Sequence, residues 1–218
     1  MIEAHVFSYG QRHLYADEWD QWLRLRHQVY IEEKRWHAPN ADGRETDQFD
    51  NEAATYVLGL ERGRVVTSAR LIPCSRPTLV SDVFPHFCER GGVPDKPDWI
   101  EWTRTLTIPE LRSGGRQSIL TQLCAAVMEY CLQEGAAKVG GIQELFFLPK
   151  WKHLGWKTTP LGLPQEIDGS GDCVVAFMDV SEAALDNVRA ALGIDHSLLH
   201  HRGELPRLID GDRLELAR

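Results

Sequence analysis

Charged and aromatic side chains recur at defined spacing in three stretches of the sequence. An arginine is followed by an aromatic residue four positions later and by a tryptophan six positions after that. An acidic run, an Arg-Leu pair and a Glu-Trp-Thr-Arg box come next. In order, the side chains are Arg26, Tyr30, Trp36, Glu45, Asp47, Asp50, Arg70, Glu101 and Arg104. Guanidinium groups bind carboxylates, carboxylates bind cations or move protons, and aromatic faces hold cations. As an ordered set, these residues indicate a binding or catalytic site.

Arg26 lies on an apolar helical stripe. Residues 17–33 predict a helix because apolar residues recur there at three- and four-residue intervals. A guanidinium on that stripe is costly to bury without partners. The stripe by itself favours an Arg26 that extends to water, but Asp47, Asp50 and Glu101 are available as counter-charges. We therefore interpret Arg26 as part of the site.

These residues resemble the pattern of the acyl-homoserine lactone synthases, acyltransferases that make quorum-sensing autoinducers. The resemblance implies a reaction between S-adenosylmethionine and an acyl thioester, both of them substrates. The amine attacks the acyl carbonyl to form an amide. The carboxylate then attacks its own γ-carbon, which expels methylthioadenosine and closes the lactone. The implied fold is a three-layer α/β/α sandwich with a mixed sheet, similar to the N-acetyltransferase (GNAT) superfamily.

On this resemblance, the charged residues receive distinct roles. We expect Asp47 and Asp50 to bind the ammonium and sulfonium groups. Arg26 and Arg104 are expected to grip the amino-acid carboxylate or to brace the acidic loop, with bidentate geometry that lysine lacks. Arg70 is expected to hold Glu45 or Asp47 in place.

Glu101 is the candidate general base, acting through water, and together with Arg104 and Asp47 it forms the expected catalytic set. Residues 101 and 104 face opposite sides of a regular strand, so both can line one site only if the strand has a bulge. Backbone N–H groups from Thr103 to Leu106 are then expected to form an oxyanion site. Tyr30 and Trp36 supply faces for adenine or for the sulfonium.

The acyl pocket is assigned to Trp102, Glu144, Phe146 and Phe147. Family members that accept 3-oxo acyl chains commonly carry threonine at the position of Glu144, so the glutamate disfavours a 3-oxo long-chain substrate. The stretch 144–149, with a tryptophan close behind, resembles the subgroup that uses branched-chain or aryl acyl-coenzyme A. A plain core role for Phe146 and Phe147 remains the alternative.

Either thioester donor brings phosphates. The Gly-rich turn between Arg112 and Arg116 precedes a predicted helix, a location suited to phosphate binding, although such a turn can be purely structural. Lys150, Lys152 and Lys157 are further basic side chains in reach. The same patch can dock an acidic acyl carrier protein, and the sequence does not separate the two donors.

Composition narrows the remaining possibilities. The 218 residues, 43% hydrophobic and 26% charged, fit one globular domain (1–218) with a polar C-terminal tail from about 194 to 218. A net charge of −8 argues against nucleic acid as the main partner. The sequence shows neither a signal peptide nor an apolar run that could span a membrane, so we expect a cytoplasmic protein without a membrane partner. The five cysteines lack Cys-x-x-Cys spacing and the nine histidines lack ligand spacing, so we expect reduced, buried cysteines and no metal.

The expected elements follow hydrophobic periodicity and turn residues. We predict strands at 4–8, 54–60, 64–72, 99–108, 137–143, 156–161 and 173–180, with helices at 17–33, 117–134, 148–154 and 181–192 and a short one near 80–87. Residues 37–53 are expected to form a long loop.

Two other functions fit the same residues. One is an N-acyltransferase that acts on another amine without lactonisation, which would release no methylthioadenosine. The other is a non-catalytic relative that binds S-adenosylmethionine without turnover.

Overall fold

A mixed β-sheet runs through the computed structural model, which describes residues 1–36, 41–112 and 118–209. Within those residues nine strands form the sheet, in the order β6-β8-β5-β4-β3-β2-β1-β9, with β7 also paired to β8. The strands are β1 (Glu3–Ser8), β2 (Thr55–Glu61), β3 (Arg64–Pro73), β4 (Trp99–Thr107), β5 (Lys138–Glu144), β6 (Thr158–Pro160), β7 (Gln165–Ile167), β8 (Gly171–Asp179) and β9 (Leu199–His200).

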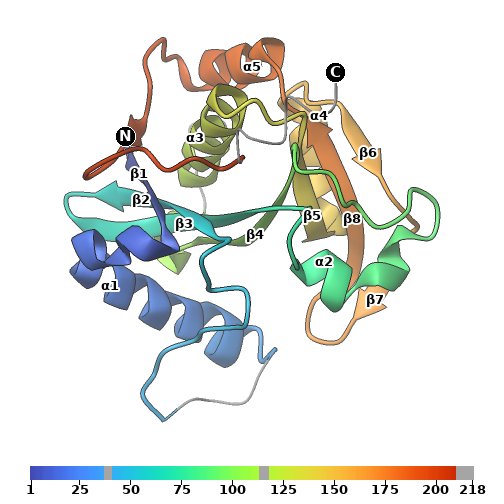
Figure 1. Ribbon diagram of the computed structural model, residues 1–218, viewed down its shortest axis with the longest axis horizontal. Helices are drawn as coiled ribbons and strands as arrows, with labels where there is room; N and C mark the ends of the chain where they lie inside the picture. The colour runs from blue at the N-terminus through green and yellow to red at the C-terminus, as the bar shows by residue number, and fades with distance from the viewer. Residues whose placement is uncertain (37–40, 113–117, 210–218) are drawn as a thin grey trace.

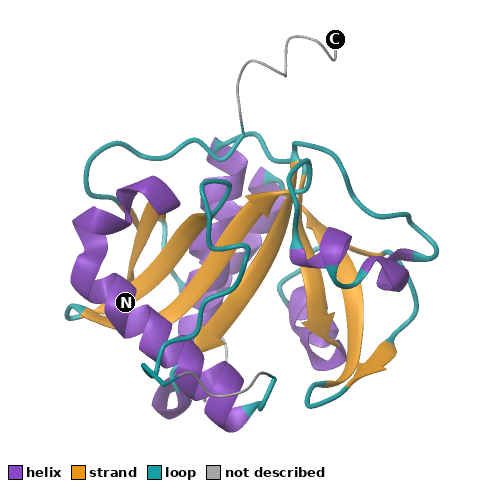
Figure 2. Cartoon of the chain, turned by 60° about the horizontal axis from the view of Figure 1, so that its bottom comes forward, coloured by secondary structure: helices purple, strands orange, loops and turns teal. Residues whose placement is uncertain are grey.

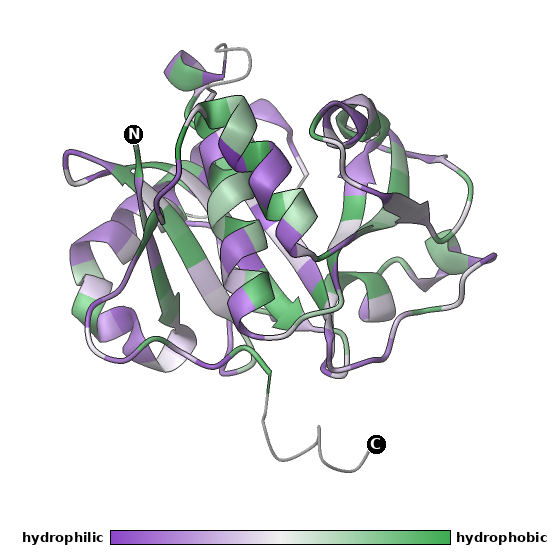
Figure 3. Cartoon of the chain, turned by 90° about the horizontal axis from the view of Figure 1, so that it is seen from above, coloured by the Kyte–Doolittle hydropathy of each residue, from purple (hydrophilic) through white to green (hydrophobic). Residues whose placement is uncertain are grey.

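Helices cover both faces of this sheet. The α-helices are α1 (Ala16–Arg26), α2 (Leu79–Asp82), α3 (Ile119–Gln133), α4 (Leu148–His153) and α5 (Glu182–Leu192). A π-helix, η2 (His27–Glu33), continues α1, and the 3-10 helices are η1 (Tyr9–Tyr15), η3 (Pro85–Cys88), η4 (Pro109–Leu111) and η6 (Leu145–Phe147). Figure 1 shows α3, α4 and α5 above the sheet and α1 and α2 below it. Seen from above, helices lie over a sheet whose strands carry hydrophobic (green) stretches (Figure 3). The expected α/β/α sandwich is therefore confirmed.

Local sequence explains where the main elements begin and end. Ser118 caps α3, since its side chain accepts a hydrogen bond from the backbone N–H of Thr121. Gly135, at φ 75°, terminates the same helix. Arg62 and Gly63 both have positive φ, as a tight turn between β2 and β3 requires. The hairpin and α3 thus fall where the sequence predicts them.

The strands β4 and β5 diverge, and this divergence positions the site. They pair in parallel only from Trp99↔Lys138 to Glu101↔Gly140. Beyond that point β5 continues beside β8 as far as Glu144, while β4 stays with β3. Figure 2 shows the two groups of strands separating. We call this divergence the β4–β5 fork, with β4 residues 102–107 as one arm and β5 residues 141–144 as the other.

The sequence-based elements are largely confirmed, with three differences. The predicted helix 17–33 changes from α to π geometry at His27. The short helix near 80–87 is divided into α2 and η3 by residues 83 and 84. Strands β7 and β9 were not predicted, because strands of two or three residues are too short for a period-two pattern.

The described part of the expected polar tail packs onto the domain. In this C-terminal strap (residues 194–209), β9 pairs in parallel with β1, and Leu198, Leu208 and Ile209 are buried. Arg202 forms an ion pair with Glu18 of α1, and the Tyr130 hydroxyl of α3 donates to the carbonyl of Pro206 at 2.7 Å. The apolar residues follow neither helical nor strand spacing, so the sequence pattern gave no sign of this packing.

The cysteines are buried and reduced, as expected. All five cysteines lie among the described residues, are buried and form no disulfide. Burial raises the pKa of every one of these thiols: Cys74, Cys88, Cys124, Cys131 and Cys173.

Among the residues that the structure describes, no helix is both long and apolar enough to cross a membrane.

Candidate active site

Six charged side chains gather on the α1 face of the sheet. We call them the ionic cluster: Arg26, Arg70, Arg104, Glu45, Asp47 and Asp50. All are buried or nearly so, with side-chain exposures from 0% to 12%. Three guanidinium groups face three carboxylates, so the cluster is neutral in total. This balance makes burial of so many charges tolerable.

Arg26 lies on an apolar stripe of α1 and is paired there with carboxylates, as burial of its charge requires. Its Nε donates to Glu45 Oε2, and its Nη1 donates to both carboxylate oxygens of Asp50 at 3.0 and 2.8 Å. Its guanidinium also lies 4.5 Å from the ring centre of Trp22. The alternative in which Arg26 reaches water is wrong, since the side chain is fully buried.

Arg70 connects the acidic loop to the sheet. Its Nη1 donates to Asp47 at 2.6 Å and to Asp50 at 2.9 Å, while its Nε donates to the Thr103 hydroxyl at 3.3 Å. The expected contact between Arg70 and the acidic loop is thus confirmed for Asp47. Asp50 also accepts bonds from the Tyr56 hydroxyl and the Asp47 backbone N–H. Its carboxylate is therefore fully engaged in holding the loop.

A bulge brings Arg104 into the cluster. The register between β3 and β4 shifts between Ser68 and Arg70, and Arg104 has a left-handed φ of 52°. The bulge expected from the spacing of Glu101 and Arg104 is confirmed. The Ser68 hydroxyl donates to the Arg104 carbonyl at 2.8 Å, which stabilises the irregular backbone. Arg104 Nη2 then donates to Asp47 and, at 3.1 Å, to Glu45.

Electrostatics distinguish the members of the cluster. Burial raises the pKa of the Asp47 carboxyl, but nearby Arg104 and Arg70 outweigh it and bring that pKa to about 2. Burial, reinforced by the charge of Arg26, lowers the pKa of Arg104 below its ordinary value. Among the described residues, Arg104 Nε and Arg26 Nη2 are buried without a hydrogen-bond acceptor. Unmet donors beside ionised Asp47 suit the binding of a zwitterion.

Tyr30 and Trp36 form an aromatic wall beside the cluster. Their rings stack with centres 5.0 Å apart, and the Arg104 guanidinium lies 5.1 Å from the centre of the Tyr30 ring. The Tyr30 hydroxyl donates to the carbonyl of Thr105 in β4 at 3.2 Å, which supplies the polar partner that a buried tyrosine needs. Burial raises the pKa of Tyr30 to about 12, so the hydroxyl stays protonated at neutral pH.

Glu101 lies at the root of the β4–β5 fork, 1% exposed. Its carboxylate accepts hydrogen bonds from the backbone N–H groups of Leu79 (2.8 Å) and Val80 (2.7 Å) at the start of α2. Burial raises its pKa, and these two backbone bonds oppose the rise. A buried glutamate with a raised pKa has the properties of a general base. The backbone partners were not foreseen, because no side-chain pattern reports them.

The structure brings together only part of the expected acyl pocket. The Trp102 ring lies 5.9 Å from that of Trp151 in α4, which stacks on Phe147 at 5.8 Å and whose Nε1 donates to Gln143. Phe146, in contrast, is 66% exposed, and within the described part of the chain its one ring contact is with Phe147. Residue alternation along a strand does not extend into η6, so the sequence could not separate the two phenylalanines.

Glu144, expected in the acyl pocket, and Arg112, expected at the phosphates, both have ion-pair partners. Glu144 pairs with Lys34 rather than pointing into an apolar space. Arg112 directly follows η4; its Nε donates back to the carbonyl of Thr107, the last residue of β4, and its Nη1 pairs with Glu33 at 2.7 Å.

Basic side chains near the start of α3 could meet the donor's phosphates. Lys150 donates to the Thr121 hydroxyl in the first turn of α3. Arg116 falls outside the described residues, and Lys157 pairs with Asp179, the last residue of β8.

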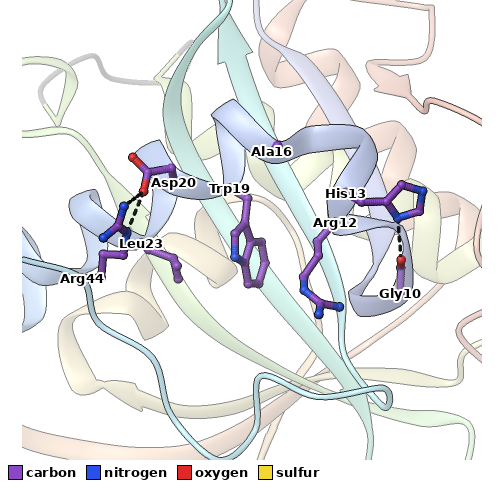
Figure 4. Close-up of a pocket in the computed structure, with 8 residues that line it drawn as sticks. All are labelled: Gly10, Arg12, His13, Ala16, Trp19, Asp20, Leu23 and Arg44. Carbon is purple, nitrogen blue, oxygen red and sulfur yellow. Dashed lines mark hydrogen bonds and ion pairs between the residues drawn. The ribbon is translucent and has the colours of Figure 1, made fainter. Parts of the chain in front are cut away.

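A separate surface hollow lies along η1 and α1 (Figure 4). Its volume is about 540 Å³, and it is lined by Gly10, Arg12, His13, Ala16, Trp19, Asp20, Leu23 and Arg44. None of these residues belongs to the ionic cluster. The hollow is therefore distinct from the candidate active site.

Comparison with known proteins agrees with this geometry. Residues 11–188 match the family of autoinducer synthases. The chain belongs to the autoinducer synthase family. It is 37% identical over 214 residues to the isovaleryl-homoserine lactone synthase of Bradyrhizobium diazoefficiens, covering 97% of this chain and 91% of that protein. It is an acyl-homoserine-lactone synthase, an acyltransferase, as the resemblance implied.

Solved structures place this synthase in the same fold. It is similar to a CoA-dependent acyl-homoserine lactone synthase, BjaI, whose structure holds SAM and isopentyl-CoA, with a TM-score of 0.89, 35% identity and full coverage of both chains. A proposed N-acetyltransferase of Lactobacillus plantarum, 18% identical over 82% of this chain and 99% of its own length, gives a TM-score of 0.53. That second likeness concerns the fold alone and agrees with the expected N-acetyltransferase-like architecture.

Proposed function

We propose that this autoinducer synthase joins S-adenosylmethionine to a branched-chain acyl-CoA and releases an acyl-homoserine lactone. The observation that carries the proposal is the ionic cluster at the β4–β5 fork, held there by the bulge at Arg104. A site for a zwitterion thereby lies next to two diverging strands. Two relatives, an isovaleryl-homoserine lactone synthase and a synthase whose structure holds isopentyl-CoA, support a short branched acyl group.

The acceptor would bind at the ionic cluster. Asp47 is the most exposed of the three acids, at 12% against 4% and 2%, and it is ionised, so it is assigned to the substrate cation. The unmet Nε of Arg104 is assigned to the substrate carboxylate. Arg26 and Asp50 then brace the loop instead of touching substrate. Tyr30 and Trp36 provide the aromatic wall for the sulfonium or adenine.

The donor would lie in the fork. Diverging parallel strands leave backbone N–H and C=O groups free to bind the amides of pantetheine. The first turn of α3, with Lys150 beside it, offers positive charge for the phosphates. Trp102 and Phe147, joined through Trp151, would bound a compact acyl group.

The reaction follows from these placements. Glu101 accepts, through water, the proton that the attacking amine loses. As the thioester C–S bond breaks, the same proton passes back through water to the departing sulfur, so that coenzyme A leaves as the thiol. Backbone N–H groups in the bulge, from Thr103 to Leu106, stabilise the oxyanion. The substrate carboxylate then attacks the γ-carbon, the bond to the sulfonium sulfur breaks, and methylthioadenosine leaves.

Mass spectrometry tests the proposal. The purified protein is incubated with S-adenosylmethionine and, separately, isovaleryl-, cinnamoyl-, 4-coumaroyl- and straight-chain acyl-CoA. We expect isovaleryl-CoA to give equal amounts of methylthioadenosine and acyl-homoserine lactone. An acylated amine without methylthioadenosine would instead support the N-acyltransferase alternative, and binding without product would support the non-catalytic one.

Three expectations stay predictions. An acyl carrier protein as donor is tested by adding acylated carrier protein to the same assay. The cytoplasmic location is tested by fractionation. The division into one domain, residues 1–218, is tested by limited proteolysis.

A further inference from the structure

One ion pair joins the end of η2 to the β5 arm of the fork. Lys34, the residue after η2, places its Nζ 2.6 Å from Oε1 of Glu144, the last residue of β5. Both side chains are partly buried, with exposures of 27% and 19%. The two residues are 110 positions apart in sequence, so tertiary structure alone brings them together.

The last turn of η2 spans the fork. Tyr30 donates to the Thr105 carbonyl in the β4 arm, and Lys34, one turn later, binds Glu144 in the β5 arm. Strands β4 and β5 themselves stop pairing at Glu101↔Gly140, four residues before Glu144. Tyr30 of η2 and Lys34 directly after it thus connect the two arms at a level where β4 and β5 no longer pair.

The backbone conformation at Arg35 positions Lys34 for this contact. Arg35 adopts a left-handed φ of 56°, which turns the chain back so that the Trp36 N–H donates to the Tyr30 carbonyl. The Trp36 ring then lies 4.9 Å below the Lys34 ammonium. A left-handed conformation in a non-glycine residue costs free energy, and other contacts must offset it.

The contacts form a continuous series between the acceptor and donor sites. Asp47 binds Arg104, Arg104 lies over Tyr30, Tyr30 stacks on Trp36, and Trp36 supports Lys34. Glu144 completes the series on the β5 arm. A partly exposed ion pair contributes only about 0–1 kcal/mol to stability, so folding alone does not explain this arrangement.

We propose that the Lys34–Glu144 pair is a positioning pair that fixes the separation of the fork arms. It rests on the proposed function: it holds the thioester carbonyl opposite the amine bound at Asp47 and keeps water from the thioester. Without it, the arms would part further, the thioester would bind less tightly, and water would compete with the amine. Hydrolysis adds the water hydroxyl to the acyl carbon and releases the coenzyme A thiol without lactone.

The test compares Lys34→Met and Glu144→Gln with the parent protein. Coenzyme A thiol and acyl-homoserine lactone are quantified with isovaleryl-CoA, and S-adenosylmethionine affinity is measured by calorimetry. We expect each variant to raise the ratio of thiol to lactone at least 5-fold and the KM for the thioester about 10-fold. The affinity for S-adenosylmethionine and the Tm should change little.

Two further variants separate positioning from general structure. The exchange Lys34→Glu with Glu144→Lys should restore the ratio to within about 3-fold of the parent. Lys138→Met is the matched control, because Lys138 also combines an ion pair, with Asp179, and a tryptophan contact, at 5.4 Å to Trp99, but lies at the closed end of the fork. It should leave the ratio unchanged.

The outcomes are distinct. A parent that forms lactone, with single variants that keep both ratio and KM within 2-fold, would overturn the positioning role alone. The same holds if the exchange fails to restore the ratio. A parent that forms no lactone with any thioester overturns the proposed function and the positioning role with it.

Discussion

Replacing Asp47 by asparagine should measure what the ionic cluster contributes to folding. Asparagine keeps the shape and can still accept hydrogen bonds, so the change removes mainly the charge. The Asp47 carboxyl has a pKa of about 2 in the folded protein against an ordinary value of 3.8. At about 1.4 kcal/mol per pKa unit, that difference of about 1.8 corresponds to roughly 2.5 kcal/mol of unfolding free energy at neutral pH. The side chain is only 12% exposed, so solvent screening reduces this figure little.

The pH dependence gives the sharper test. Because the folded-state pKa is depressed, the stabilisation is present above pH 3.8 and is lost as pH falls toward 2. We expect Asp47→Asn to lower the unfolding free energy, measured by urea titration, by roughly 2.5 kcal/mol at pH 7 and by about half that at pH 3.

A matched control lies in the same loop. Asp42→Asn makes the same charge change at a side chain that is 61% exposed and should alter stability by less than about 0.5 kcal/mol. The reasoning fails if Asp47→Asn costs less than about 1 kcal/mol at pH 7, or if its cost is the same at pH 3, because then the charge is not what stabilises the cluster.

Three other variants probe separate features. Glu101→Gln should lower kcat at least 10-fold and abolish the acidic limb of the pH–rate profile; in the parent that limb should rise with pH and lie above pH 4.5, since burial raises the pKa of the base. A parent limb unchanged by the substitution would exclude Glu101 as the base. Gly140→Ala should destabilise by at least about 2 kcal/mol in thermal unfolding, because the new Cβ would lie 2.2 Å from the Ala176 carbonyl oxygen in β8; a smaller loss would mean that the strands can shift. Arg202→Ala should cost about 1 kcal/mol and speed amide exchange at 198–200, since the ion pair with Glu18 holds the strap; unchanged exchange would assign that role to other contacts.

Sequence reasoning reached the charged part of the site because burial of charge constrains it. An arginine on an apolar stripe requires acids nearby, and Arg26 has Glu45 and Asp50. Likewise, the three-residue spacing of Glu101 and Arg104 requires a bulge, and the strand has one. In both cases a physical rule linked residue identity to geometry.

No such rule predicts the other contacts of the site. The sequence indicates only a minor role for Glu45, yet at 2% exposure it bridges Arg26 and Arg104. Glu101 is held by backbone N–H groups, which every residue possesses and no sequence pattern marks. Lys34 and Glu144 are 110 positions apart, and no local pattern in the sequence predicts a contact between them.

The C-terminal strap has a consequence for how the chain reaches its native state. Its contacts close loops of 184 residues, between Arg202 and Glu18, and 193 residues, between Glu204 and Gln11. Contacts this distant in sequence are slow to form because the closure entropy is lost before any contact compensates it. During synthesis, the outer edge of β1 therefore remains unpaired long after β2 and β3 have formed their hairpin. In that interval the exposed edge is where a nascent chain would pair with the wrong strand.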